Sequence, residues 1–211
     1  VHTREELART PDDELEPTPE PEPNPEPEPE PNPGSDEAIL SVEGEQKFSG
    51  KSGDVINLSH SADFEVDSAT IAFAFQADTV SGRQGLLSKD ASYHVGGGHH
   101  FVALVENGQL FVRFQDSSGE YVAKIAGIEA GVEYELAVNF GPDGTAIWLD
   151  GELVDQSSFI MNWENNTQYM QIGANGWGSG NGQGSFTDVF NGTISEVTIL
   201  EGVHTPEELA A

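Results

Sequence analysis

Large and small side chains alternate in the stretch Ala69-Thr-Ile-Ala-Phe-Ala-Phe75, with a large apolar residue at every second position from Ile71 to Phe75. Successive side chains of an extended chain point to opposite faces, so the large residues share one face. An alternation of period two is typical of a β-strand that is buried on one side. The stretch therefore predicts a strand whose large side chains pack into a core.

The same alternation returns further along the chain, between turn signals. It is found in residues 110–115, 134–140 and 146–149. Asn107-Gly108 and Asp150-Gly151 favour type I′ turns, because Asn, Asp and Gly accept positive φ angles. Gly141-Pro142-Asp143-Gly144 indicates a longer hairpin loop. Short antiparallel strands in such numbers predict an all-β fold, a two-sheet antiparallel β-sandwich of the jelly-roll type.

The N-terminal part of the chain has a different composition. From Pro17 to Pro33 every second residue is proline, and most residues between the prolines are glutamate. Proline favours the polyproline II conformation and the glutamates repel one another, so this segment is expected to be a stiff or disordered linker. The linker contains almost nothing that a core would bury.

An internal repeat suggests what the linker separates. Val1-His-Thr-Arg-Glu-Glu-Leu-Ala8 recurs as Val203-His-Thr-Pro-Glu-Glu-Leu-Ala210, with one substitution. Each copy predicts a short helix with a capping box, formed by Thr at the N-cap and Glu at N3. We therefore divide the chain into residues 1–10, the tail of a preceding similar module, 11–36, a linker rich in Pro and Glu, and 37–211, the sandwich with its short C-terminal helix.

Charge and composition exclude some classes of function. The formal net charge is -29 and only eight residues are Lys or Arg, whereas phosphate binding needs clustered cations, so nucleic acid is not an expected partner. No apolar run approaches the ~18 residues that a membrane span needs. A sandwich without cysteine favours bacterial secretion over an animal ectodomain. We predict an extracellular or cell-surface bacterial protein.

Catalytic signatures are also missing from the sequence. Glycoside hydrolases on such a sandwich carry paired carboxylates on one strand face, in runs of the kind Glu-x-Asp-x-x-Glu. Glu133 and Glu135 share a face, but it is the face opposite the apolar one, where glutamates keep a sheet soluble. Nothing resembles a nucleophile elbow. The module is therefore expected to be non-catalytic.

Two stretches rich in glycine, amides and hydroxyls do not alternate, residues 88–100 and 175–185. Sugars are held by an aromatic face and by amide or carboxylate groups, while glycine lets a ligand approach the backbone. The alternative is a flexible rim loop with Trp177 packed beneath it. The candidate ligand-binding residues are Asp90, His99, Asn175, Trp177, Ser179 and Asn181.

Several motifs occur in an order that resembles a known family. They are Gly85-Leu-Leu-Ser-Lys-Asp90, Ile147-Trp-Leu-Asp-Gly151, Ile172-Gly-Ala174 and Phe190-Asn-Gly-Thr-Ile-Ser-Glu-Val197. With the first stretch and the closing helix, they resemble the laminin-G-like, concanavalin-A-like jelly-roll domain of bacterial secreted multidomain proteins. The resemblance implies two sheets packed face to face, binding of glycans or protein partners on rim loops or the concave sheet, and calcium in many members.

Calcium binding is a further implication of the resemblance. Calcium prefers oxygen ligands, and Asp90 and Asp188 are the predicted metal ligands, with Asn181 or backbone carbonyls beside them. Members of the family commonly carry Asp after Gly-x-Ile in the last strand, but this chain has Ser195 and Glu196 there.

The sequence thus predicts a non-catalytic binding module of an exported multidomain protein, with calcium-assisted recognition of a glycan or an extracellular protein. Neighbouring repeat modules of the parent chain are further expected partners. Two alternatives stay open. One is a structural or protein-interaction repeat in an adhesin array. The other is an accessory domain of a polysaccharide-degrading enzyme.

Overall fold

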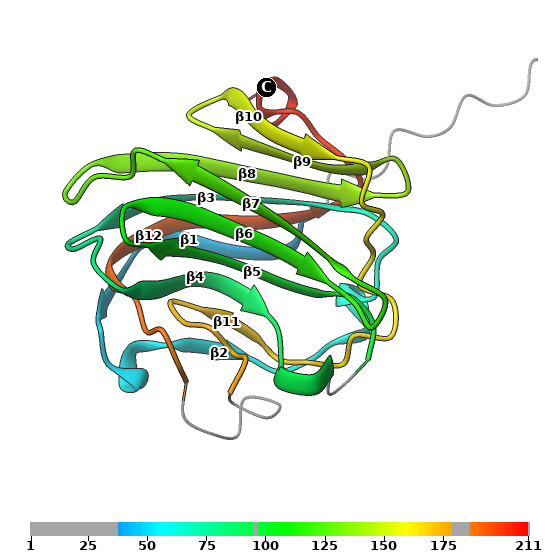
Figure 1. Ribbon diagram of the computed structural model, residues 1–211, viewed down its shortest axis with the longest axis horizontal. Helices are drawn as coiled ribbons and strands as arrows, with labels where there is room; N and C mark the ends of the chain where they lie inside the picture. Colours follow the sequence, from blue (N-terminus) through cyan, green and yellow to red (C-terminus); the bar gives the residue numbers. More distant parts are fainter. Residues whose placement is uncertain (1–37, 95–96, 179–185, 211) are drawn as a thin grey trace, which may run out of the picture. The chain divides into compact units, whose positions relative to one another are not determined.

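In the computed structural model, residues 38–94, 97–178 and 186–210 are described, and they form two six-stranded antiparallel sheets (Figure 1). The first sheet has the order β1 (Ala38–Ser49), β12 (Asn191–Glu201), β3 (Ala69–Ala77), β8 (Glu133–Gly141), β9 (Gly144–Leu149) and β10 (Glu152–Ser157). The second has the order β2 (Ile56–Leu58), β11 (Met170–Ile172), β4 (Arg83–Lys89), β5 (His100–Glu106), β6 (Gln109–Gln115) and β7 (Glu120–Ala126). The predicted all-β sandwich is confirmed. The predicted tail 1–10 and linker 11–36 lie outside the described residues.

The core lies between the two sheets. Ile71, Phe73 and Phe75 of β3 are at most 4% exposed, as their alternation predicts. Trp163, from the connection between β10 and β11, is fully buried and joins the layers. Its ring centroid lies 4.8 Å from that of Phe140 in the first sheet and 6.4 Å from that of Phe101 in the second. Burial of such aromatic side chains is the main stabilising contribution in a fold of this kind.

The two tight turns agree with the sequence prediction. Asn107 and Gly108 have φ angles of 51° and 77°, and Asp150 and Gly151 have 52° and 77°, as type I′ turns require. The prediction of a longer loop at residues 141–144 was wrong. Gly141 pairs with Gly144, so Pro142 and Asp143 alone form the connection.

Gly144 explains this short connection. Its φ of 118° is a conformation that favours glycine, and a Cβ there would lie 2.2 Å from the Ser157 carbonyl oxygen of β10. Glycine therefore lets β9 and β10 pair up to the turn itself.

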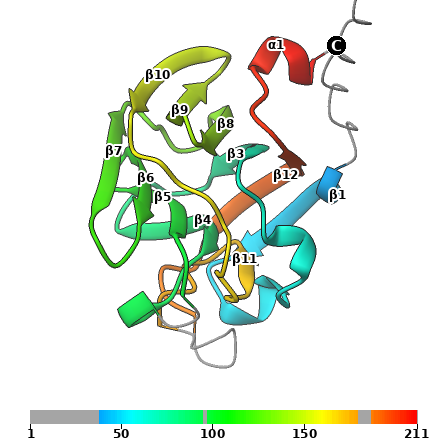
Figure 2. The ribbon, with the colours of Figure 1, turned by 90° about the vertical axis from the view of Figure 1, so that its right-hand side faces the viewer.

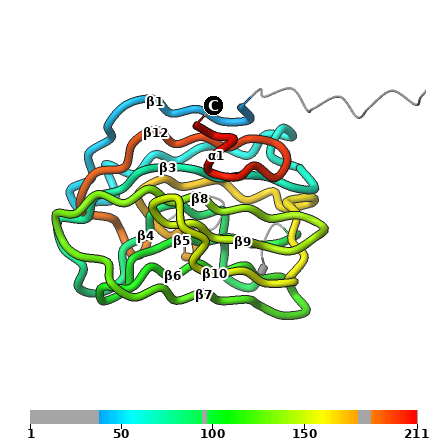
Figure 3. Tube along the Cα trace, turned by 90° about the horizontal axis from the view of Figure 1, so that it is seen from above, coloured from blue at the N-terminus to red at the C-terminus, as the bar shows by residue number. Residues whose placement is uncertain are grey.

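Residues 202–210, here called the C-terminal arm, cross the outer face of the first sheet. The Thr70 hydroxyl donates to the Gly202 carbonyl at 2.9 Å and accepts from the His204 N–H at 2.8 Å, and the Asn139 amide donates to the His204 carbonyl at 2.8 Å. The arm ends in helix α1 (Pro206–Leu209), whose capping box joins Thr205 and Glu208 as predicted. Figure 2 shows α1 outside the layer of β3 and β12, and Figure 3 shows it over that layer. In the described ranges no helix is long and apolar enough to cross a membrane.

Candidate functional site

The two glycine-rich stretches meet on the outer face of the second sheet. The Ser88 hydroxyl at the end of β4 lies 3.0 Å from the Ala174 carbonyl oxygen and accepts from the Gly176 N–H at 2.9 Å. The Ser92 N–H donates to the Trp177 carbonyl at 2.7 Å, which ties one stretch to the other. Gly85 is needed beneath them, because a Cβ there would lie 2.3 Å from the Ala174 carbonyl carbon. These contacts fix the backbone of Trp177 beside the end of β4.

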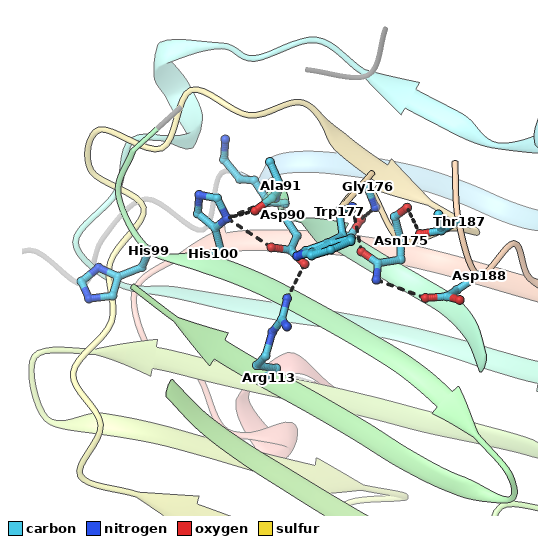
Figure 4. A network of polar contacts seen from close by, with 12 residues as sticks. Asp90, Ala91, His99, His100, Arg113, Asn175, Gly176, Trp177, Thr187 and Asp188 are labelled. Carbon is cyan, nitrogen blue, oxygen red and sulfur yellow. Dashed lines mark hydrogen bonds and ion pairs between the residues drawn. The ribbon is translucent and has the colours of Figure 1, made fainter. Parts of the chain in front are cut away.

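Asp90 is the centre of a buried polar network (Figure 4). Its side chain is fully buried; Oδ2 accepts from Arg113 Nη2 at 2.5 Å, and Oδ1 lies 3.1 Å from His100 Nδ1. Asp90 follows β4, His100 begins β5 and Arg113 lies in the middle of β6, so three neighbouring strands supply the group. A charge-assisted pair of this kind is strong when its groups are removed from water.

Arg113 has hydrogen-bonding capacity left. Its Nε is buried and has no partner among the residues the structure describes, and its side chain is 16% exposed. Trp177 is 46% exposed, and its backbone N–H donates to Asn175 Oδ1 at 2.9 Å. The site therefore combines an exposed aromatic face with a guanidinium group that is fixed by a carboxylate.

Positive charge gathers on this face. Phe111 lies two residues before Arg113 in β6, and its ring is flanked by Arg83 Cζ at 5.7 Å and Lys124 Nζ at 5.5 Å. Three of the chain's eight Lys and Arg residues thus lie on one face of a protein with a formal charge of -29. Arg83 also pairs with Glu106 and Asp188 at 3.6 and 3.5 Å. Since carboxylates of the chain pair with Arg83 and Arg113, the face offers guanidinium and ammonium hydrogen-bond donors to a polar ligand and not an excess of positive charge.

The predicted metal ligands lie differently from what calcium requires. The Asp90 carboxylate contacts Arg113 and His100, and Asp188 Oδ2 lies beside Arg83 and accepts from Asn175 at 3.3 Å. Over the described part of the chain, no group of three or more His, Asp or Glu side chains is placed to hold a metal. As the side chains lie, the donor set does not fit calcium, and calcium binding stays a prediction.

The other predicted ligand-binding residues either lie away from Asp90 or lie outside the described residues. His99 lies outside the Asp90 network: its Nε2 is 3.1 Å from Asp116 Oδ2, and its ring meets Phe159 edge to face. Ser179 and Asn181 lie outside the described residues. His100 and Arg113 were not among the predicted site residues. Each occupies an outward position of an ordinary alternating strand, so only the pairing of β4, β5 and β6 reveals their contact with Asp90.

Lys89 lies directly behind the site and is fully buried. Its Nζ donates to the carbonyls of Asn166 and Gln168 at 2.7 and 2.8 Å, which fixes the loop before β11. Burial lowers the pKa of Lys89 to about 7, and the charge of Glu65 opposes this shift. Its ammonium group is also 5.8 Å from the Phe64 ring centroid.

Comparison with known families gives one match over most of the chain. The laminin G family model described as the concanavalin A-like lectin/glucanases superfamily matches residues 49–210. No curated protein sequence matches the chain.

Solved structures share the fold at low identity. The carbohydrate-binding module CBM40 of the Ruminococcus gnavus IT-sialidase, bound to alpha2,3 sialyllactose, is 16% identical with a TM-score of 0.65, and the match covers 82% of this chain and 97% of that one. The K499G mutant of the NanB sialidase from Streptococcus pneumoniae is 17% identical with a TM-score of 0.65 over 82% of this chain and 28% of that one. The native heptameric SAP-like pentraxin of Limulus polyphemus is 14% identical with a TM-score of 0.57, over 77% and 78% of the two chains. Identities this low show a common fold alone.

Proposed function

Because the chain belongs to the concanavalin A-like lectin/glucanases superfamily, we propose that it is a glycan-binding module whose site lies around Trp177 and Arg113. The observation that carries the proposal is the 46% exposed Trp177 beside the buried pair of Asp90 and Arg113. An indole face packs on the C–H patches of a sugar ring, and the guanidinium group donates to its oxygens. The CBM40 structure bound to alpha2,3 sialyllactose supports the proposal through its common fold.

The preferred ligand of this site is an acidic sugar. Arg83, Arg113 and Lys124 lie on the same face, and a guanidinium group pairs with a carboxylate through two parallel hydrogen bonds. Asp90 holds one nitrogen of Arg113 in place, which lowers the entropy lost when a ligand carboxylate binds. A terminal sialic acid has the required carboxylate together with hydroxyl groups.

The proposed module binds without hydrolysing. Hydrolysis of a glycosidic bond needs one carboxyl group that donates a proton and a second that attacks or activates water. Asp90 is held by Arg113 and His100, and Asp188 is held by Asn175 and Arg83, so these two carboxylates already stabilise the site itself. The proposal further includes that the parent protein is exported and that the module contributes to adhesion.

Calorimetric titration with alpha2,3 and alpha2,6 sialyllactose, with lactose as the uncharged reference, tests the proposal. We expect the sialylated sugars to bind more tightly than lactose, and Trp177→Ala to remove that difference while the melting temperature is kept. Arg113→Lys keeps the charge but loses the planar fork, so we expect it to weaken sialyllactose binding about tenfold.

Equal binding of lactose and sialyllactose would contradict the acidic ligand, and no binding of any glycan on a broad array would contradict the module itself. A parallel titration with a chelator tests calcium. Binding through Arg113 is expected to survive the chelator, and its loss would show that calcium assists recognition.

A further inference from the structure

A second concave site lies on the opposite side of the sandwich. A pocket of about 500 Å³ is found at the end of the hairpin of β8 and β9, on the first sheet. Asn139, Ala146 and Gln156 are cross-strand partners of β8, β9 and β10, and they form a row across its floor. Val203 of the C-terminal arm borders the pocket. The volume is within the range of small-molecule sites.

One buried polar atom of this pocket lacks a partner. Asn139 is 2% exposed. Its Oδ1 has no hydrogen-bond partner among the described residues. The Asn139 Nδ2 already donates to the His204 carbonyl at 2.8 Å, so the arm fixes the orientation of the amide and leaves the oxygen open. Buried polar groups are normally satisfied, and a ligand with a hydroxyl donor would satisfy this oxygen.

The chemistry of the lining selects the class of ligand. Gln156, Ser157 and Ser158 add amide and hydroxyl groups, while Pro142, Ala146 and Val203 offer apolar surface. No Lys or Arg lines the pocket within the described residues, and the carboxylate of Asp143 disfavours an anion. Planar amides pair well with neighbouring hydroxyls of a sugar ring.

We propose that this pocket is a second saccharide site, for a neutral sugar. It has no residue in common with the site around Trp177, and it lies on the other sheet, so it does not rest on the function proposed above.

A neighbouring pocket of about 580 Å³ extends the same face. Trp148, two residues beyond Ala146 in β9, forms one wall, and the small side chains of Ala72 and Ala137 form its floor. Ala146 and Trp148 lie on the same side of their strand. A saccharide of more than two units that leaves the first pocket on this side would therefore meet an aromatic surface.

Amide NMR titrations with lactose, maltose and cellobiose at millimolar concentrations test the site. We expect shifts at the Asn139 and Gln156 side-chain amides and at the backbone of residues 144–146. Gln156→Leu removes an amide from the floor of the pocket, so it should weaken binding about tenfold without lowering the stability of the free protein. Ala146→Phe fills the pocket and should abolish the shifts.

Trp177→Ala is the matched control, because it should leave these shifts unchanged. Three results would overturn the proposal. They are no shift with any of the three sugars, shifts confined to the surroundings of Trp177, and wild-type binding by both Gln156→Leu and Ala146→Phe. Shifts at Asn139 without any binding of sialyllactose would refute the first site and leave the second intact.

Discussion

Arg113 combines two roles in the proposed site, because the guanidinium group that stabilises Asp90 is also the one proposed to bind the ligand. Asp90 has no solvent exposure and would leave Arg113 without its counter-charge if it were neutralised. Removal of one partner from a buried ion pair costs more than removal of both, since the remaining charge stays uncompensated. The stability of the site and its affinity are therefore coupled through a single residue.

We expect Asp90→Asn to lower the free energy of unfolding by roughly 3 kcal/mol, because Arg113 then lacks its partner. The double variant Asp90→Asn with Arg113→Met should recover much of that loss, while glycan binding stays absent. Urea denaturation measures the first effect and calorimetry the second. Equal instability of the single and double variants would contradict the ion-pair account.

Lys89 gives a pH dependence with a definite sign. Burial lowers its pKa in the folded protein from 10.5 to about 7, so between these values the unfolded chain binds more protons than the folded one. The contribution of Lys89 to stability should therefore rise as the pH increases from about 7 towards 10. Urea denaturation of the wild type and of Lys89→Met should show a difference that grows in favour of the wild type over this range. Lys51→Met, at an exposed position, is the control for loss of a lysine side chain.

At the residue scale, the sequence indicates some site residues and misses others for a physical reason. Trp177 and Asn175 stand in a glycine-rich segment that breaks the alternation, which is why they can be identified. Arg113 and His100 sit in regular strands as ordinary outward residues, and their meeting with Asp90 depends on strand register, which a single sequence does not specify.

At the scale of the elements, glycine positions decide how closely the strands pair. Gly144 has a φ of 118° and no room for a Cβ, whereas Gly119 has open space around the position of a Cβ and no positive φ. Gly144→Ala is therefore expected to lower the free energy of unfolding by about 1–3 kcal/mol, and Gly119→Ala to change it by less than about 0.5 kcal/mol. Thermal denaturation of the two variants compares them, and similar melting temperatures would contradict the close approach of Gly144 to Ser157.

Local signals predict the strands and tight turns well, because period-two alternation and the residues of type I′ turns act over short distances. The connection at residues 141–144 shows the limit of local signals. Its two glycines and proline indicate a loop, but pairing of Gly141 with Gly144 depends on β10 alongside, which no local signal contains.

For the whole molecule, the C-terminal arm closes the outer face of the first sheet. Removal of residues 203–211 should lower the free energy of unfolding by roughly 1–3 kcal/mol, because Thr70 and Asn139 lose their hydrogen bonds with the backbone of His204. It should also weaken binding of neutral sugars, since Val203 borders that pocket. Sialyllactose binding on the other sheet should not change. Calorimetry and thermal denaturation of the truncated protein test all three expectations.

The fold as a whole is predictable from sequence because many weak motifs agree in order and spacing. The pockets of the first sheet cannot be predicted from sequence, because they arise where the arm crosses strands that are distant in the chain. Asn139 illustrates this, since as a sequence position it is one polar residue between Val138 and Phe140.

The pairing of β1 with β12 has a mechanical consequence. Ala38 at the start of β1 is the partner of Leu200 near the end of β12, so the chain enters and leaves the sandwich at the same end of one antiparallel pair. Tension applied through the two ends would open this pair from that end, loading its hydrogen bonds one after another instead of all together. Once the contacts of the arm with Thr70 and Asn139 yield, the sandwich should open at low force. Single-molecule pulling would measure that force, which reflects the rate of unfolding and not the equilibrium stability.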